Sequence, residues 1–376
     1  MTGSNDTRIA LFYYSPFRGE GVARMFLMLA RVLAERGHAV DLLCVTADGP
    51  LADELAPGVR LFELKHSGML RRLIRMAAYF RTAKPDAVIS AMDIANSCAL
   101  ARSLAGSKTR VVASYRVPLS YYFNMRGGIY RVVGPFLARW LLPRADIIAT
   151  VSRGVAKDAA ALTHAPDKIV TIYNPVEVER VQELAREPVD HPWYAASNVP
   201  VVLGVGRLEK QKDFATLIRA FRRVRDKTEA RLVILGEGSE RTGLEALIDE
   251  LGLGDDVWLP GFDKNPYRYM ARSSVFVLSS IAEGFGNVLL EALAVDTPVV
   301  STDCEAGPRE ILGDGAYGRL VPVGDVTALA RCITEAFADP VCDRGRRSRA
   351  RMFSVDATVE RYLQAAGIAP DRLSVH

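Results

Sequence analysis

The 376-residue sequence has few cysteines and no long apolar run. Its five cysteines are scattered, and no two of them form a Cys-x-x-Cys pair. This excludes a disulfide framework and a zinc site built on such pairs. No apolar stretch reaches the ~20 residues that a membrane-spanning helix needs. The first residues are polar and do not resemble a secretory signal, so we expect a cytoplasmic protein.

Several common signatures of nucleotide chemistry are also missing. No Gly-x-Gly-x-x-Gly follows the first apolar run, which disfavours a dinucleotide-dependent dehydrogenase, and no P-loop sequence occurs. No Asp-x-Asp motif lies in a suitable loop, so we predict that no metal ion and no other cofactor is needed. No nucleic-acid recognition motif accompanies the basic residues, and we expect no nucleic-acid partner.

Charge is distributed unevenly along the chain. Residues 1–180 hold 24 Lys and Arg against 15 Asp and Glu, whereas the remainder holds 24 against 29. Between Lys65 and Arg144 there are 14 basic residues and only two acidic ones, Asp86 and Asp93. A basic front half indicates contact with an anionic partner such as a membrane surface. The alternative is a solvated basic surface without a partner.

Short apolar runs of strand length alternate with segments of helical periodicity over most of the chain. The runs at 8–14, 39–45, 59–64, 86–91, 110–114, 146–151 and 168–172 predict one set of strands, and those at 201–206, 231–235, 257–259, 275–278, 299–301 and 319–321 a second. Val/Ile/Leu-rich strands separated by helices indicate parallel sheets covered on both faces.

The alternation pauses over residues 174–199, a segment with several prolines that we interpret as a linker. The chain is therefore predicted to hold two Rossmann-like, doubly wound α/β domains. We place the first at 1–180, completed by a returning C-terminal helix at about 354–376, and the second at 181–353. Ligands bind such sheets beyond the carboxyl ends of the strands, so two facing domains would hold their ligands across a cleft.

The first motif is Ser279-Ser-Ile-Ala-Glu283-Gly-Phe-Gly-Asn287-Val-Leu-Leu-Glu291, where a strand leads through a glycine-containing loop into a helix. The glycines allow a ligand to approach the backbone, and free N–H groups of Val288 and Leu289 at the helix start suit a phosphate. Glu283 and Glu291 could hold hydroxyl groups at two points of one ligand. The alternative is two surface glutamates beside an ordinary loop.

The second motif is Gly204-Val-Gly206-Arg207-Leu-Glu-Lys-Gln-Lys212-Asp-Phe214, again between a strand and a helix. A guanidinium at Arg207 and an ammonium at Lys212 together suit a diphosphate. The alternative is a pair of exposed surface cations.

These motifs together resemble the retaining glycosyltransferases of family 4, which have the GT-B fold. Weaker matches lie at Ala30–His38, at Leu235–Gly238, at Gly261-Phe262 with Asn265-Pro266, and at Gly307–Leu312. The resemblance implies transfer of a sugar from a nucleotide-diphosphate donor, with UDP as the default nucleotide, to a glycan or lipid-linked acceptor in the synthesis of surface polysaccharide or glycoconjugate. It also implies retention of the anomeric configuration.

The resemblance implies a role for each matching position. Arg207 and Lys212 would neutralise the diphosphate, and Glu283 would bind the donor sugar. Donor contacts are further expected at Gly206, Phe262, Gly284, Phe285, Gly286, Asn287, Val288, Leu289 and Glu291. Gly19 and Gly21 would keep the first loop slim beside the phosphates and the acceptor.

One position departs from the family. Many relatives carry a histidine near the donor sugar where this chain has Arg116. A cation there could support the leaving phosphate, but it cannot act as a base because arginine stays protonated.

Residues 118–142 mix aromatic and aliphatic side chains with Arg126, Arg131 and Arg139. Such a stretch could attach the protein to the inner face of the cytoplasmic membrane. The alternative is that the apolar residues are buried and the arginines extend from the core to solvent.

Two other functions share part of this pattern. A non-catalytic module of the same fold could hold a nucleotide or a glycan, although the presence of Glu283, Arg207 and Lys212 speaks against it. A sugar-nucleotide epimerase would share the α/β architecture but not these two motifs.

Overall fold

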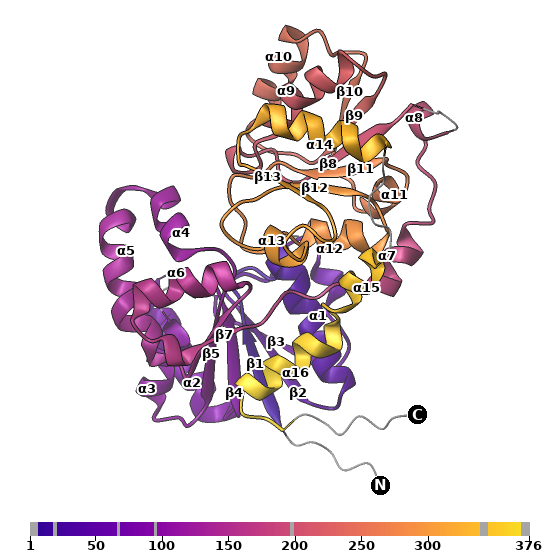
Figure 1. The fold of residues 1–376 in the computed structure, drawn as a ribbon. Helices are drawn as coiled ribbons and strands as arrows, with labels where there is room; N and C mark the ends of the chain where they lie inside the picture. Colours follow the sequence, from indigo (N-terminus) through magenta and orange to yellow (C-terminus); the bar gives the residue numbers. More distant parts are fainter. Residues whose placement is uncertain are drawn as a thin grey trace. The chain divides into compact units, whose positions relative to one another are not determined.

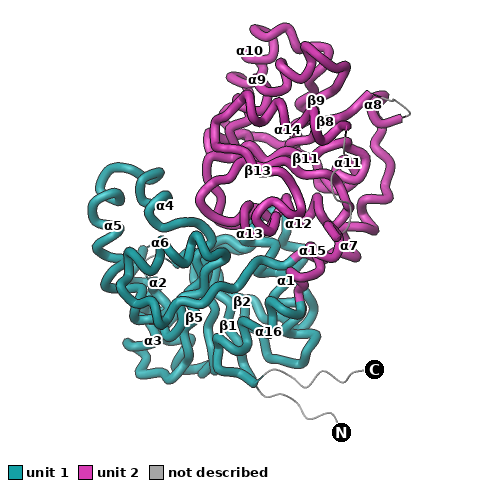
Figure 2. Tube along the Cα trace, in the orientation of Figure 1, with its two compact units in different colours: residues 1–175, 356–376 teal, residues 176–355 magenta. Residues whose placement is uncertain are grey.

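The computed structural model describes residues 7–17, 21–65, 68–93, 96–195, 199–338 and 345–369. The chain divides into two compact units (Figure 2), unit 1 with residues 1–175 and 356–376 and unit 2 with residues 176–355. Each unit is built on one parallel sheet with helices on both faces (Figure 1). The predicted pair of Rossmann-like α/β domains is confirmed.

Over the described residues, the sheet of unit 1 has the strand order β3-β2-β1-β4-β5-β6-β7, and all neighbours are parallel. The strands are β1 (Arg8–Phe12), β2 (Ala39–Cys44), β3 (Val59–Glu63), β4 (Ala87–Ala91), β5 (Arg110–Tyr115), β6 (Ile147–Thr150) and β7 (Ile169–Thr171). The order reverses between β1 and β4, which is where doubly wound sheets open a crevice for ligands.

The helices of unit 1 pack on both faces of this sheet (Figure 1). They are α1 (Gly21–Glu35), α2 (Met69–Ala83), α3 (Ser97–Ala105), α4 (Leu119–Arg126), α5 (Gly128–Leu141), α6 (Arg153–Thr163) and α16 (Val355–Ala365). Short 3-10 turns occupy Ala52–Glu54, Leu142–Arg144 and Pro166–Lys168. The last helix, α16, returns to unit 1, where Arg36 forms an ion pair with Asp356 and Arg110 Nε donates to Ala365 O at 2.8 Å.

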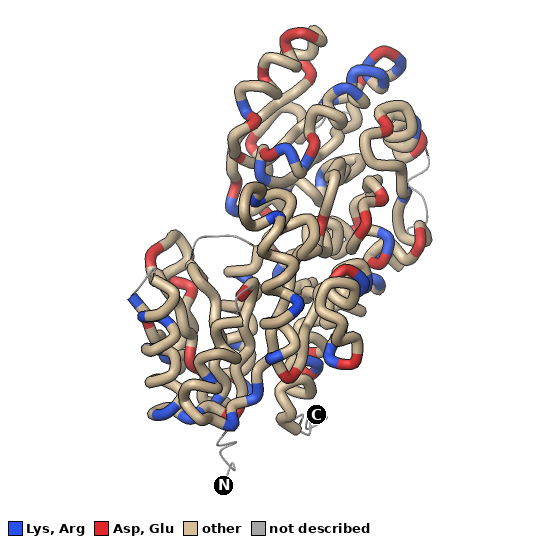
Figure 3. The backbone as a smooth tube through the Cα atoms, turned by 90° about the vertical axis from the view of Figure 1, so that its left-hand side faces the viewer, with Lys and Arg blue, Asp and Glu red and all other residues tan. Residues whose placement is uncertain are grey.

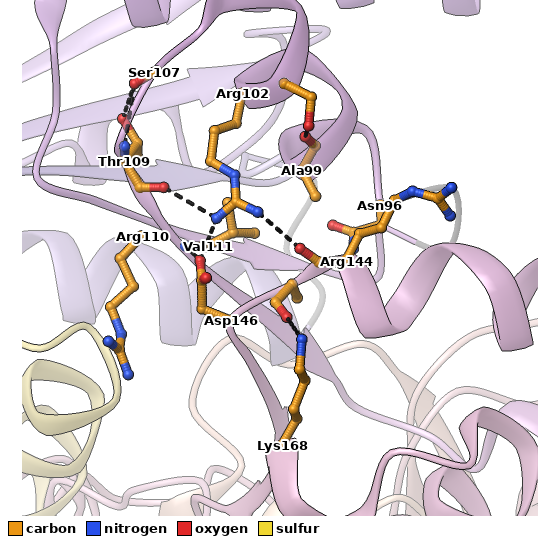
Figure 4. Close-up of polar contacts among 12 residues, drawn as sticks. Asn96, Ala99, Arg102, Ser107, Thr109, Arg110, Val111, Arg144, Asp146 and Lys168 are labelled. Atoms are coloured by element: carbon orange, nitrogen blue, oxygen red, sulfur yellow. Dashed lines mark hydrogen bonds and ion pairs between the residues drawn. The ribbon is translucent and has the colours of Figure 1, made fainter.

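A polar cluster joins α3 to the amino ends of β5 and β6 (Figure 4). The guanidinium of Arg102 donates to the carbonyls of Thr109 and Arg144 and forms an ion pair with Asp146. The same carboxylate accepts the backbone N–H of Val111 at 2.7 Å. One arginine therefore satisfies loop carbonyls that would otherwise lack donors near the sheet edge.

In unit 2 the described residues form a sheet of order β10-β9-β8-β11-β12-β13, also entirely parallel. The strands are β8 (Val201–Val205), β9 (Arg231–Leu235), β10 (Val257–Gly261), β11 (Val275–Leu278), β12 (Val299–Thr302) and β13 (Arg319–Val321). Here the order reverses between β8 and β11, the two strands that precede the motifs singled out in the sequence.

The helices of unit 2 are α7 (Val178–Leu184), α8 (Pro192–Ala195), α9 (Phe214–Arg225), α10 (Arg241–Glu250), α11 (Tyr267–Met270), α12 (Asn287–Ala294), α13 (Pro308–Ile311), α14 (Val326–Ala338) and α15 (Arg346–Arg351). Helix α9 shows why they form. Asp213 caps its start by accepting the N–H of Thr216 at 3.3 Å. Phe214, Leu217, Ile218 and Phe221 follow at helical spacing and are all buried.

The segment 174–199 differs from the expected linker. It contains α7, whose Val178 and Val181 are buried. The carbonyl of Leu184 accepts the side-chain N–H of Asn265 at 2.8 Å, so the helix is held on unit 2. The surrounding prolines concealed a short amphipathic helix, because they interrupt the chain on both sides without breaking the helix itself.

Candidate functional site

The two sequence motifs meet at one edge of the unit 2 sheet. β8 and β11 are neighbouring parallel strands, so their carboxyl ends lie side by side. The loop after β8 contains a 3-10 turn, Lys210–Lys212, and leads into α9. The loop after β11 leads into α12. Both loops therefore flank the point where the strand order reverses.

Lys212 and Glu283 form an ion pair that joins the two loops. Lys212 Nζ lies 2.6 Å from Glu283 Oε1, and the hydroxyl of Ser280 donates to the same oxygen at 2.7 Å. The Lys212 and Glu283 side chains are only 17% and 10% exposed. A charge-assisted hydrogen bond so shielded from water is stronger than a surface ion pair.

Further hydrogen bonds fix one loop on the other. Gln211 Nε2 donates to Ala282 O at 2.7 Å, and the N–H of Ile281 donates to Gln211 O at 2.8 Å. The Ser279 hydroxyl donates to Lys212 O at 2.8 Å. Sequence reasoning missed Ser280 and Gln211, although both lie inside the two motifs; their polar side chains next to the charged residues were the available signal.

Two glycines make this packing possible. A Cβ at Gly206 would lie 3.3 Å from the Lys212 side chain, so the lysine stem crosses the end of β8 where a larger residue would obstruct it. Gly236, after β9, has φ +145°, and a Cβ there would lie 1.8 Å from Gly206 O. The loops after β8 and β9 therefore pack backbone against backbone.

Arg207, in the loop after β8, is exposed. Within the described part of the chain it has no ion-pair or hydrogen-bond partner for its side chain. The site thus offers one ammonium that is already neutralised and one guanidinium that is not.

The start of α12 presents backbone donors to the same edge. Gly286 precedes the helix with φ +98°, a conformation that favours glycine. The N–H of Leu289 donates to Gly286 O at 2.9 Å, which differs from the expectation that it is free. The N–H of Val288 has no acceptor among the described residues. One amide at the positive end of the helix dipole therefore remains for an anion.

The other residues expected to contact the donor near α12 are either buried in the loop before this helix or partly exposed on it. The ring of Phe285 is buried against Phe353, with ring centroids 5.6 Å apart, so only its backbone could meet a ligand. A Cβ at Gly307 would lie 2.0 Å from Phe285 O, so the start of α13 closes over this loop. Gly284 is buried, while Asn287 and Glu291 are partly exposed at the start of α12.

Phe262 extends from the end of β10 with 65% of its surface exposed. The residues after it are held in place, because Asp263 accepts the N–H of Asn265 at 2.7 Å and pairs with Arg268 at 2.6 Å. Burial is the largest single effect on Asp263 and opposes its ionisation, but the Arg268 charge and the hydrogen bonds from Arg268, the Asn265 N–H and Tyr269 together outweigh it and lower the pKa of that carboxyl. An exposed ring on a fixed loop suits stacking on a nucleobase.

Cys304 lies close to Glu283, although nothing in the sequence assigned it to this site. Burial, with a smaller contribution from the Glu283 charge, raises the pKa of its thiol to about 12. The thiol is therefore neutral near pH 7 and behaves as a small apolar side chain.

Three of the expected site residues, Gly19, Gly21 and Arg116, belong to unit 1. Gly19 lies outside the described residues, and Gly21 is the first residue of α1. Arg116 follows β5 and is 7% exposed. Its guanidinium donates to Tyr362 Oη at 2.8 Å and to Asn174 Oδ1, both neutral acceptors, and burial lowers its pKa.

Neither a metal centre nor a spanning helix is apparent in the described ranges. No three His, Cys, Asp or Glu side chains there gather in a way that could hold a metal ion. No helix among these residues is both long enough and apolar enough to cross a bilayer.

Comparison with protein families identifies both halves of the chain. Residues 19–180 match the model described as Glycosyltransferase Family 4, and residues 190–353 match the model of Glycosyl transferases group 1. Both matches correspond to the units seen in the structure.

Comparison with individual proteins likewise finds glycosyltransferases. The N-acetylgalactosamine-N,N'-diacetylbacillosaminyl-diphospho-undecaprenol 4-alpha-N-acetylgalactosaminyltransferase of Campylobacter jejuni is 37% identical over 68% of this chain and 68% of its own length. The lipopolysaccharide core biosynthesis glycosyltransferase LpsE of Rhizobium meliloti is 30% identical over 93% of this chain and 96% of its own. The structure of Anabaena Alr3699/HepE in complex with UDP shares the fold, with a TM-score of 0.77 and 19% identity over 96% of this chain and 99% of its own.

Proposed function

This chain is an enzyme of glycosyltransferase family 4 with the GT-B fold, and from that premise we propose that it transfers a sugar from a UDP-sugar to a lipid-linked or glycan acceptor, with retention of the anomeric configuration. The proposed product is a cell-surface polysaccharide or glycoconjugate. The C. jejuni relative, whose name specifies a diphospho-undecaprenol acceptor, and the R. meliloti relative of lipopolysaccharide synthesis support this class of acceptor. Such acceptors place the reaction at the cytoplasmic face of a membrane.

The contact between Lys212 and Glu283 is the observation that carries the proposal. It brings a cation and a carboxylate together beyond the carboxyl ends of β8 and β11. In a sugar diphosphate the anionic diphosphate is likewise adjacent to the hydroxyl-rich sugar, so one such ligand can meet both groups. Lys212 and the exposed Arg207 bind the diphosphate. Glu283 accepts hydrogen bonds from hydroxyls of the donor sugar.

Other groups of the proposed site bind the rest of the sugar donor. The N–H of Val288, at the start of α12, donates to a phosphate oxygen. Glu291 accepts from the ribose hydroxyls, and the ring and backbone at Phe262 contact the base. Gly206, Gly284 and Gly286 let the donor approach the backbone.

The chemistry that these groups favour is cleavage of the bond between the sugar and the diphosphate. Positive charge develops on the sugar ring while negative charge accumulates on the leaving diphosphate. Arg207, Lys212 and the amide of Val288 stabilise that negative charge without reorganising at the moment of reaction. Unit 1 binds the acceptor, and Arg116 supports the leaving group indirectly by ordering the residues after β5. No metal ion takes part.

The decisive experiment incubates the purified protein with UDP- and GDP-sugars and a lipid extract, and measures released nucleotide. Lys212→Met and Glu283→Gln keep the side-chain sizes but remove the charges. We expect each to lower kcat/KM for the preferred donor by about 10²–10³-fold, as for other losses of a preorganised electrostatic contact.

Lys210→Met and Glu305→Gln are matched controls, since both residues are exposed and lie near the same loops. Both should turn over at nearly the wild-type rate. Wild-type turnover by Lys212→Met would contradict the proposed site, and binding of UDP-sugars without any release of UDP would contradict the proposed reaction.

A further inference from the structure

Helices α4 and α5 form a hairpin that is packed in an unusual way. Helix α4 buries Leu119 and Phe123, but the buried residues of α5 are only Gly134 and Ala138. A Cβ at Gly134 would come within 2.4 Å of the Phe123 ring, so α5 approaches α4 closely through its smallest side chains. Figure 1 shows the hairpin at one side of unit 1.

The large apolar side chains of α5 lie on its other side and are not covered. They occur at positions i, i+3, i+4, i+7, i+8 and i+11 of one helix, the spacing that in a globular protein faces the core. Here their exposed fractions run from 37% to 76%; they are Ile129, Val132, Val133, Phe136, Leu137 and Trp140. The alternative of a buried apolar stretch is therefore wrong for α5.

The charged side chains of the hairpin itself have one sign. Arg131 and Arg139 are exposed on α5, and the guanidinium of Arg126 lies over the rings of Tyr122 and Tyr130 at the turn of the hairpin. The sequence contains no Asp or Glu between residues 94 and 145. Figure 3 views the molecule from the side on which α4 and α5 lie in Figure 1 and colours Lys and Arg blue.

We propose that the α4–α5 hairpin docks unit 1 on the surface of an anionic lipid bilayer. Helix α5 lies parallel to the membrane, with its apolar stripe at the boundary between headgroups and acyl chains. Trp140 and Tyr130 occupy the interface, where amphipathic rings are favoured. Arg126, Arg131 and Arg139 bind lipid phosphates.

The dimensions and composition favour a bilayer over another protein. Fourteen residues extend about 21 Å as a helix, which is too short to span a membrane but ample for lying in its interface. An apolar stripe with Trp and Phe, flanked by arginines and free of acidic residues, complements anionic headgroups electrostatically. This inference does not depend on which sugar is transferred.

The test measures partition of the full-length protein, without nucleotide, onto sucrose-loaded vesicles. Vesicles of 30% phosphatidylglycerol in phosphatidylcholine are compared with pure phosphatidylcholine. We expect strong binding to the anionic vesicles only. The double variant Arg131→Gln/Arg139→Gln should bind about 25-fold more weakly, at about fivefold for each lost charge, and Phe136→Ser/Trp140→Ser at least about tenfold more weakly.

The matched controls Leu104→Ser and Arg219→Gln replace exposed residues of the same kinds outside the hairpin and should bind like the wild type. Urea unfolding of every variant shows whether it is folded, and because no nucleotide is present the test is separate from that of the proposed function. In the wild type, vesicles should shift the tryptophan emission to shorter wavelength, and Trp140→Phe should abolish that shift while the protein still binds. Wild-type protein that stays in the supernatant, or a concentration-dependent dimer that Phe136→Ser/Trp140→Ser dissociates, would overturn the proposal.

Discussion

At the scale of single residues, the two groups proposed to bind the donor pair with each other. Lys212 and Glu283 neutralise each other at 2.6 Å while both are largely shielded from water. Removing either one would leave its partner as a buried, unpaired charge, which costs about 3–5 kcal/mol. In the proposed site an arriving diphosphate would compete with Glu283 for the ammonium, and this competition would free the carboxylate for sugar hydroxyls. Under that proposal the ion pair links donor binding to the exposure of its own sugar contact.

The position of the Lys212 stem depends on Gly206. We predict that Gly206→Ala weakens UDP binding by about three- to tenfold with little loss of stability. The new methyl group would meet the lysine stem at 3.3 Å, and the stem can move only if the contact between its Nζ and Glu283 changes. Titration calorimetry with UDP and urea unfolding measure the two effects.

Gly243→Ala is the control for this prediction. Gly243 lies inside α10 and has no atom within 4 Å of an added Cβ. Alanine there should raise the free energy of unfolding by about 0.5–1 kcal/mol and leave UDP affinity unchanged. Equal UDP affinity in the two alanine variants would show that the lysine stem is not constrained by the glycine.

At the scale of secondary-structure elements, Arg116 joins parts of unit 1 that are far apart in the sequence. It follows β5, and its guanidinium donates to Asn174, after β7, and to Tyr362, on α16. The partners that the structure describes carry no negative charge, so among the described residues this buried cation has no counter-ion. Burial of this kind is unfavourable unless the hydrogen bonds are well formed. The last helix is thus held on the sheet by a residue in the position where the family has a histidine.

We predict that Arg116→Met lowers the free energy of unfolding by about 1–3 kcal/mol, because the hydrogen bonds of the guanidinium to Asn174 Oδ1 and Tyr362 Oη are lost. Tyr362→Phe is the matched control, since it removes the acceptor on α16 and keeps the charge. Urea unfolding gives the stabilities, and initial rates give kcat and KM. Arg116→Met should lower kcat further than Tyr362→Phe does, with similar KM. Identical kcat values would restrict Arg116 to holding α16.

The elements that could be predicted from sequence are those with a strong local signal. β9, β11 and β13 begin and end where their apolar runs do, and α9 matches its periodic pattern from Phe214 to Arg225. The adjacency of Lys212 and Glu283 was also foreseeable, because both follow strands expected in one parallel sheet. Their direct pairing was not, since it depends on how two irregular loops pack.

The remaining features depend on contacts between distant residues. Arg116 donates to Tyr362, which lies 246 positions further along the chain, and no local sequence pattern predicts such a contact. Helix α5 has the apolar spacing of a core-facing helix, yet it packs through Gly134 and Ala138 because only small residues allow such close approach to Phe123. Periodicity shows that a helix has an apolar face but not what covers it.

At the scale of the whole molecule, the chain has a net charge of +4, but its negative charge is concentrated in the half that holds the two donor motifs. The chain beyond residue 180 holds 29 acidic against 24 basic residues, so a nucleotide diphosphate is not attracted to unit 2 by its overall field. Its affinity must come from groups within a few ångströms, because more distant charges are screened at physiological ionic strength. Many enzymes meet this need with a divalent cation. In the proposed site, Arg207, Lys212 and the N–H of Val288 supply the positive charge.

We therefore predict that transfer does not depend on a divalent metal. Dialysis against EDTA should leave kcat/KM within about twofold of the untreated value, and added Mg²⁺ should not raise it. UDP release is followed by chromatography, because coupling enzymes that need Mg²⁺ would obscure the result. Lys212→Met provides the contrast: with one cation removed, millimolar Mg²⁺ should restore part of its activity by bridging the phosphate oxygens. A loss of more than about tenfold in the EDTA-treated wild type, reversed by Mg²⁺ or Mn²⁺, would show that the protein's own cations do not neutralise the leaving diphosphate.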